Sequence, residues 1–139
     1  MISLSKALGK GALASCRELD LGGNQIGDAG LEALSSSLAT GALASCRELR
    51  LGGNQIGDAG LEALSGSLAT GALAGLTTLG LSGNKISDKG VAALAKAIAP
   101  VSEGGSGALS ALTSIGLFGN PASEEARQAV TDVLASRSR

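Results

Sequence analysis

The chain repeats itself, and this repetition limits what it can fold into. Residues 41–70 copy residues 11–40 except that Asp20 and Ser36 are replaced by Arg50 and Gly66. The same frame returns at residues 71–106 and 107–139. One unit of about thirty residues cannot bury its apolar face alone, so such units stack on one another. We therefore expect a single domain spanning residues 1–139, built from four stacked repeats and the partial repeat in residues 1–10.

Two apolar periodicities occur within each unit. Leu19 and Leu21 alternate with polar residues, which predicts a short half-buried strand. Leu31, Leu34 and Leu38 have helical spacing, which predicts a helix with one apolar stripe. The strands of successive units must then lie side by side as a parallel sheet with the helices packed behind it. The predicted fold class is α/β, a solenoid with one parallel sheet.

Polar residues and glycines recur where each strand leads into its helix. We expect the side-chain amide of the recurrent asparagine to bond its own loop and the neighbouring repeat, at Asn24, Asn54, Asn84 and Asn120. A carboxylate that complements the free N–H groups of a helix N-terminus is expected at Asp28, Asp58 and Asp88. Glycines that let the helix approach the sheet closely are expected at Gly30, Gly60 and Gly90. The same connection is thus predicted in each repeat.

The pattern LxxLxLxxN, followed by xIxxxG and LxxxL, resembles the leucine-rich repeats of the ribonuclease-inhibitor type. Similar units occur in Ran GTPase-activating proteins and in NOD-like receptor arrays, and the resemblance covers residues 1–136. It implies a curved solenoid with strands on the concave side and helices on the convex side. It does not name a partner, because this scaffold carries many unrelated functions.

The two ends of the chain depart from the repeat in different ways. Residues 1–10 align with the second half of a repeat helix, so we expect a fragment of a longer array with no N-terminal cap. The bare edge at residues 18–22 would permit edge-to-edge self-association. Residues 107–139 are expected to act as a C-terminal cap. The apolar stripe of the last helix is expected at Ala126, Ala129, Val130, Val133 and Leu134.

No catalytic, cofactor-binding or metal-binding residue is indicated. Without histidine the chain has no Ser-His-Asp triad and no histidine metal site. Cys16 and Cys46 are one repeat apart, and the parallel side-chain vectors of stacked repeats favour two buried thiols over a disulfide. Reduced thiols are typical of the cytoplasm, where we expect the protein. The glycine-rich turns match no phosphate-binding motif, so we expect no enzyme.

Composition also argues against two classes of partner. The net charge is −1 without clusters of Lys or Arg, and Phe118 is the only aromatic residue. Nucleic acids and acidic membrane surfaces both require clustered basic residues, so we expect neither as a partner. No stretch reaches the roughly 18 to 20 apolar residues of a membrane-spanning helix.

The concave sheet is the surface on which we expect a protein partner. The candidate contact residues are Glu18, Asp20, Glu48, Arg50, Thr78, Ser82, Ser114 and Phe118. Asp20 and Arg50 should fall side by side, either as a surface ion pair or as a contact row that has begun to diverge. Phe118 is an aromatic anchor of the kind found at interface hot spots. We expect a non-enzymatic interaction scaffold, the alternatives being a regulatory domain for a small GTPase or a fragment without independent function.

Overall fold

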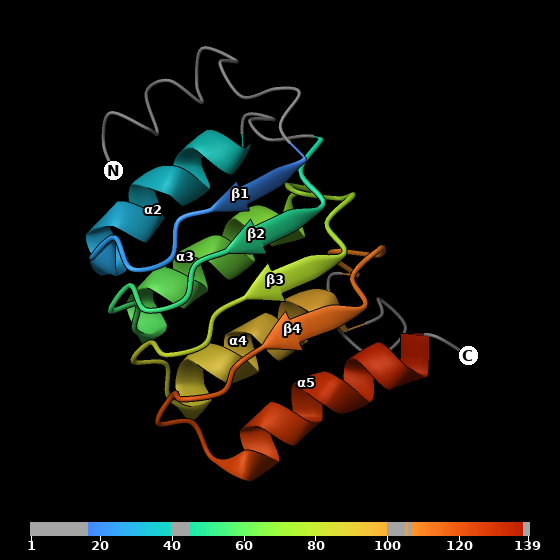
Figure 1. Cartoon of the computed structure of the whole chain (residues 1–139). Coiled ribbons are helices and arrows are strands. Elements are labelled where there is room, and N and C mark those ends of the chain that lie inside the picture. Colours follow the sequence, from blue (N-terminus) through green and yellow to red (C-terminus); the bar gives the residue numbers. More distant parts are fainter. Residues whose placement is uncertain (1–16, 40–44, 100–104, 106, 138–139) are drawn as a thin grey trace.

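The computed structural model describes residues 17–39, 45–99, 105 and 107–137. Within these residues a strand followed by a helix occurs four times (Figure 1). The elements are β1 (Glu18–Asp20), α2 (Gly27–Ala39), β2 (Glu48–Arg50), α3 (Asp58–Ala69), β3 (Thr78–Gly80), α4 (Asp88–Ile98), β4 (Ser114–Gly116) and α5 (Glu124–Arg137). The predictions that fall on residues 1–16, among them the partial repeat helix and the bare N-terminal end, lie outside the described residues.

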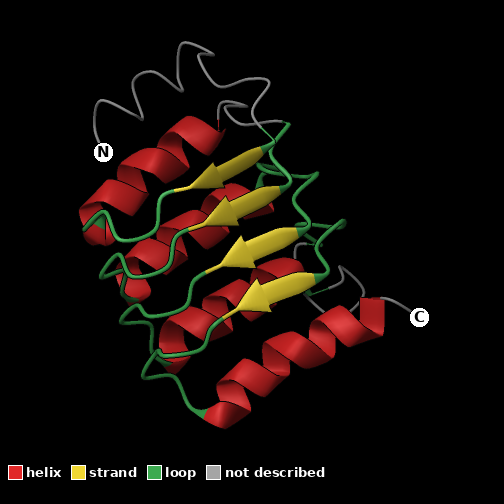
Figure 2. Cartoon of the chain, viewed as in Figure 1, coloured by secondary structure: helices red, strands yellow, loops and turns green. Residues whose placement is uncertain are grey.

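The four strands form one parallel sheet in the order β1-β2-β3-β4, and the helices form a single layer behind it (Figure 2). The central leucines of the strands lie side by side, since Leu19 pairs with Leu49 and Leu49 pairs with Leu79. These leucines point toward the helices, whose apolar stripes supply the other half of the core. The predicted α/β solenoid with its parallel sheet is therefore confirmed.

The recurrent asparagines connect each repeat to the one before it. Asn54 Oδ1 accepts hydrogen bonds from the N–H groups of Asn24, at 2.8 Å, and Ile26, at 3.3 Å. Its Nδ2 donates to the carbonyl oxygens of Leu21, at 2.9 Å, and Leu51, at 3.0 Å. The amide thus satisfies backbone groups of its own loop and of the preceding repeat, as predicted from the sequence.

The aspartates cap the helix of the following repeat. Asp28 Oδ1 accepts hydrogen bonds from the N–H groups of Gly57, at 2.7 Å, and Gly60, at 2.9 Å, at the start of α3. Asp58 does the same for the start of α4. The residue preceding α4, Ser87, makes no side-chain capping hydrogen bond to its own helix. The acceptors for these N–H groups at the starts of α3 and α4 therefore come from the neighbouring repeat, which fixes the stacking of these helices at this end.

The predicted reason for the helix glycines was wrong. A Cβ atom on Gly60 would lie 2.6 Å from Asp28 Oδ1 and 3.1 Å from Asp28 Cα, and no atom of the sheet lies that close. The glycine makes room for the aspartate of the preceding repeat, which approaches to bond the Gly60 N–H. The close approach is therefore between two neighbouring helices, and the sheet is not involved.

The last helix, α5, completes the core only in part. Val130 is buried, and Ala126, Val133 and Leu134 pack against the core while remaining partly exposed. Ala129 is exposed, so its assignment to the apolar stripe was wrong. This residue lies on the outer side of α5 beside Gln128 and Asp132, away from α4.

Candidate functional site

The face of the sheet opposite the helices, here called the strand face, carries the predicted contact residues. The strand register places Glu18, Glu48, Thr78 and Ser114 in one row across the sheet. Asp20, Arg50, Gly80 and Gly116 form the row beside it. Because strand side chains alternate between faces, both rows point away from the helices. Six of the eight predicted residues thus lie together, and Ser82 and Phe118 follow the ends of β3 and β4.

A shallow hollow of about 370 Å³ crosses the strand face. Its floor is low because glycines occupy several of the positions that point toward solvent. The residues lining it are Asp20, Gly22, Arg50, Gly52, Thr78, Leu79, Gly80, Ser82, Ser114 and Gly116. Five of the predicted contact residues are among them. The glycines were not predicted as site residues, although their recurrence at outward positions of successive strands is a signal visible in the sequence.

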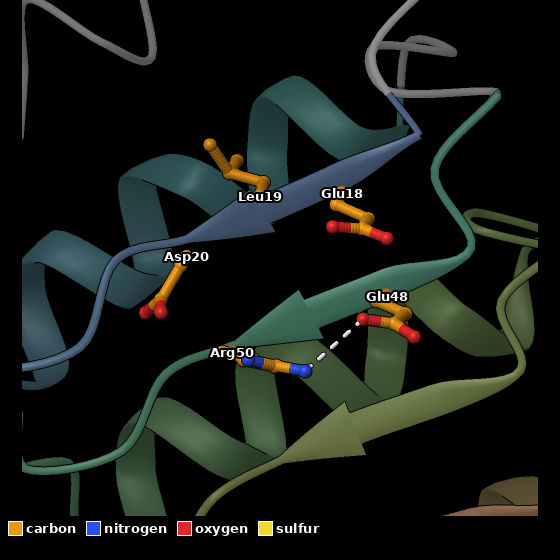
Figure 3. Close-up of a pocket in the computed structure, with 5 residues that line it drawn as sticks. All are labelled: Glu18, Leu19, Asp20, Glu48 and Arg50. Carbon is orange, nitrogen blue, oxygen red and sulfur yellow. Dashed lines mark hydrogen bonds and ion pairs between the residues drawn. The ribbon is translucent and has the colours of Figure 1, made fainter.

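The charged end of the strand face lies on β1 and β2. Glu48 and Arg50 turn toward each other on the same strand, with Arg50 Nη2 at 3.2 Å from Glu48 Oε2 (Figure 3). Asp20 Oδ1 instead accepts a hydrogen bond from the N–H of Gly22 at 2.9 Å. The alternative of an Asp20–Arg50 ion pair is therefore wrong, although the two residues are neighbours in the sheet. Residues two apart on one strand share a face, so Arg50 reaches Glu48 without crossing to β1.

The ion pair does not hold this end of the site rigidly. The side chain of Arg50 is 59% exposed and that of Glu48 is 32% exposed. A solvated pair of this kind contributes about 0–1 kcal/mol. A small cavity of about 30 Å³ lies beside it, lined by Glu18, Leu19, Asp20, Glu48 and Arg50. The guanidinium of Arg50 can thus leave Glu48 at little cost when another acceptor approaches.

Phe118 lies outside the hollow and is 80% exposed. Within the described residues, no other large hydrophobic side chain is exposed. Its carbonyl oxygen accepts a hydrogen bond from the N–H of Gly83 at 2.8 Å, which fixes its backbone beside the turn after β3. An aromatic ring at the end of the sheet that is largely exposed to solvent has the properties of an interface anchor.

The remaining candidates for chemistry are accounted for by packing. Cys46 is buried, and its Sγ donates to the carbonyl oxygen of Glu48 at 3.1 Å. Leu76 and Leu112 occupy the same repeat position and are also buried. Cys16 lies outside the described residues. Within the part of the chain that the structure describes, no three His, Cys, Asp or Glu residues lie together as a metal site would require. No helix in that part has the length and apolar character needed to cross a membrane.

Comparison with known proteins supports the assignment of the repeats. The family model described as leucine-rich repeat matches residues 17–35, 47–65 and 76–95. The structure is similar to the tropomodulin C-terminal domain of Caenorhabditis elegans, with 12% identity, a TM-score of 0.68, and coverage of 98% of this chain and 92% of that one. It is also similar to actin-binding site 2 of leiomodin-1, with 17% identity, a TM-score of 0.67, and coverage of 98% and 88%. No curated protein sequence matches the chain closely enough to count as a relative.

Proposed function

We propose that this leucine-rich repeat solenoid is a non-enzymatic scaffold that binds a protein partner on its strand face. The observation that carries the proposal is the hollow of about 370 Å³, which draws residues from all four described strands or the turns that follow them. A surface this wide and shallow fits a segment of another protein better than a small molecule, which binds in a deeper apolar pocket. The 139 residues would form one domain, with repeats at 11–40, 41–70, 71–106 and 107–139.

The chemistry of the strand face suggests what such a partner offers. On β1 and β2, three carboxylates, from Glu18, Asp20 and Glu48, surround the single guanidinium of Arg50. A basic side chain of the partner would complement this end and set the orientation of binding. The opposite end offers the hydroxyls of Thr78, Ser82 and Ser114 for hydrogen bonds. Nothing among the described residues favours a small GTPase in particular, so the proposal stops at a protein partner.

Glycine substitutions give a matched test. Gly80 lies in the hollow, and a Cβ there would meet Arg50 atoms at 3.6 to 3.8 Å, which is ordinary contact. Gly66 lies exposed on α3, on the helix side, where a Cβ would meet no atom within 4 Å. Gly80→Gln should therefore fill the binding surface without disturbing the fold, and Gly66→Gln should leave binding unchanged.

The measurement is quantitative capture of proteins from a cell extract on the wild-type chain and both variants, with far-UV circular dichroism to confirm folding. We expect a set of proteins retained by the wild type and by Gly66→Gln and lost on Gly80→Gln. Actin is the first purified candidate, because the leiomodin-1 structure carries the name of an actin-binding site. Equal retention by all three chains would overturn the strand-face proposal. A cytoplasmic location is part of the proposal and rests on the buried thiol of Cys46.

A further inference from the structure

The two sides of the strand face differ in chemistry. The charged side chains that line the hollow, Asp20 and Arg50, come from β1 and β2. On the side of β3 and β4 the outward positions in the hollow carry hydroxyls or are glycines. The largely exposed ring of Phe118 follows the end of β4. A ligand that crosses all four strands therefore meets a carboxylate on one side and an aromatic ring on the other.

The carboxylate of Asp20 is held in place but meets no cation among the described residues. Its Oδ1 accepts a hydrogen bond from the N–H of Gly22 at 2.9 Å. The guanidinium of Arg50 turns away from it, toward Glu48 (Figure 3). Asp20 is exposed and lines the hollow. A carboxylate that is fixed by its own backbone and has no cation beside it complements a lysine or arginine of a partner.

The position of Phe118 follows from the turns after the strands. The N–H of Gly53 donates to Ser82 O at 3.0 Å, and the N–H of Gly83 donates to Phe118 O at 2.8 Å. Ser82 and Phe118 thus occupy equivalent positions in successive repeats. Because Ser82 lines the hollow, the side chain of Phe118 leaves the backbone on the same side of the sheet. The ring therefore belongs to the strand face and lies beside the hollow.

The middle of the strand face suits the main chain of a partner. Thr78, Ser82 and Ser114 line the hollow, and within the described residues their hydroxyls make no hydrogen bond. The floor between them is low at Gly80 and Gly116, which are paired in register. A helix that binds through an apolar stripe would find no exposed large apolar side chain here to cover. An extended segment has free N–H and C=O groups, which the hydroxyls can bond where the glycines let its backbone approach.

We infer that the partner presents an extended segment that crosses the strands, with a lysine or arginine at Asp20 and an apolar side chain at Phe118. The inference rests on the proposed function of the strand face. From β1 to β4 there are three strand spacings, or about 14 Å. Residues on one face of an extended segment are two apart, so residues four apart share a face and lie about 13 Å from each other. Separations of two or six residues would be about 7 Å too short or too long. The basic and the apolar residue are therefore four positions apart.

The spacing is tested by selection from a phage-displayed library of random short peptides on the immobilised full-length chain. We expect the recovered peptides to be enriched, relative to the unselected library, in a basic and an apolar residue with three residues between them. Selection on Gly80→Gln, whose side chain fills the hollow, is the control and should lose this enrichment. Recovery of no peptide, or of peptides without this spacing, would overturn the inferred segment.

The two ends of the segment are tested by the affinity of a recovered peptide, measured by fluorescence polarisation. Asp20→Asn keeps an acceptor for the N–H of Gly22 but removes the charge, so it should weaken binding about fivefold and remove most of its dependence on salt. Phe118→Ala should weaken binding about tenfold, because it removes the aromatic anchor. The matched control is Glu32→Gln, which removes an exposed carboxylate on α2 and should leave binding unchanged.

The outcomes separate this inference from the proposed function. A peptide that is lost on Gly80→Gln, but binds Asp20→Asn and Phe118→Ala as tightly as the wild type, would keep the strand face as the binding surface and overturn the segment assigned to it. A peptide that binds Gly80→Gln as tightly as the wild type would overturn both, since it binds elsewhere on the chain.

Discussion

At Gly90, helix α4 meets the side chain of Asp58 from the preceding repeat. A Cβ at this position would lie 2.5 Å from Asp58 Oδ1 and 3.0 Å from Ile86 Cγ2. Gly90→Ala should therefore lower the free energy of unfolding by about 1–3 kcal/mol, although alanine is the better helix former. Gly66→Ala, where a Cβ meets nothing, should raise it by about 0.5–1 kcal/mol. Urea denaturation measures both, and a stabilised Gly90→Ala would contradict the explanation.

The fourth repeat shows what accompanies the loss of this glycine. Ala126 stands in the slot of Gly90, and its N–H donates to Ser123 Oγ at 3.1 Å instead of to an aspartate. Asp88, in the preceding repeat, bonds the N–H of Ser123. The glycine is thus coupled to an aspartate that reaches two N–H groups of the next helix, and it is replaced where a local serine cap takes over one of them.

The carboxyl of Asp58 should make stability depend on pH. Burial alone would raise its pKa, but hydrogen bonds from Ser87 and Gly90 and the charge of Lys89 outweigh burial and hold the pKa below its ordinary value of 3.8. Because the folded pKa is lower than the unfolded one, the stabilisation is complete above about pH 4 and is lost as the pH falls through the folded pKa. Asp58→Asn should lower stability at pH 7 and flatten the acid limb of the stability–pH curve.

The matched control for Asp58 is Glu62→Gln on the exposed side of α3. This variant also removes one carboxylate, yet it should leave both the stability at pH 7 and the acid limb close to those of the wild type. Chemical denaturation at a series of pH values, from neutral to well below the ordinary pKa of an aspartate, follows the acid limb of each variant. Parallel curves for the wild type and Asp58→Asn would show that this carboxylate does not cap α4.

At the scale of the elements, the asparagine turns join each strand to its neighbour. The side chain of Asn84 is buried and bonds backbone groups of two repeats, whereas that of Asn24 is exposed and, within the described residues, bonds only its own loop. Asn84→Ala should cost about 2–4 kcal/mol, because it leaves several buried backbone groups without partners, and Asn24→Ala should cost about 1 kcal/mol or less. The denaturant midpoints of the two variants give the two losses of stability. Equal losses would contradict the role assigned to the buried asparagine side chains.

The elements and their pairing could be predicted from the sequence, because each repeat contains its own strand and helix periods and the repetition fixes their register. The sequence did not predict that each aspartate caps the helix of the following repeat and not its own helix. Position in the first turn is the same whether Asp58 bonds its own helix or the next one, and only the packing of adjacent helices decides between them. A signal was present in hindsight: Asp58 and Gly60 recur together as Asp28 and Gly30, and both change in the fourth repeat.

The candidate site was predictable to a similar degree. Alternation along the strands placed Glu48 and Arg50 on the correct face, because the period of two follows from backbone geometry. Which partner the guanidinium selects depends on side-chain rotamers on a solvated surface, where the competing pairs differ by less than about 1 kcal/mol. The hollow depends on glycines at outward positions, and its depth becomes evident only when Gly80 is placed beside Gly116 and Gly22 beside Gly52.

For the whole molecule, stability should be distributed unevenly along the stack. In a solenoid each repeat contacts only its neighbours, so the free energy of unfolding is close to a sum of repeat and boundary contributions. Strands β2 and β3 each pair with a strand on both sides, whereas β1 and β4 each pair with one strand of the described sheet. Leu49 and Leu79 in the middle are fully buried, whereas Leu19 and Ile115 at the two ends are half-buried.

This gradient can be measured with two substitutions in one column of the sheet. Leu79 and Ile115 are paired in register and lose the same number of carbon atoms on replacement by alanine. Leu79→Ala should cost about 2–5 kcal/mol, because the cavity it leaves is closed on all sides. Ile115→Ala should cost about 1–2 kcal/mol, since part of the side chain is already in contact with water. The comparison is made by urea denaturation. If Ile115→Ala cost as much as Leu79→Ala, the fourth repeat would be as fully enclosed as the third, which would contradict the gradient.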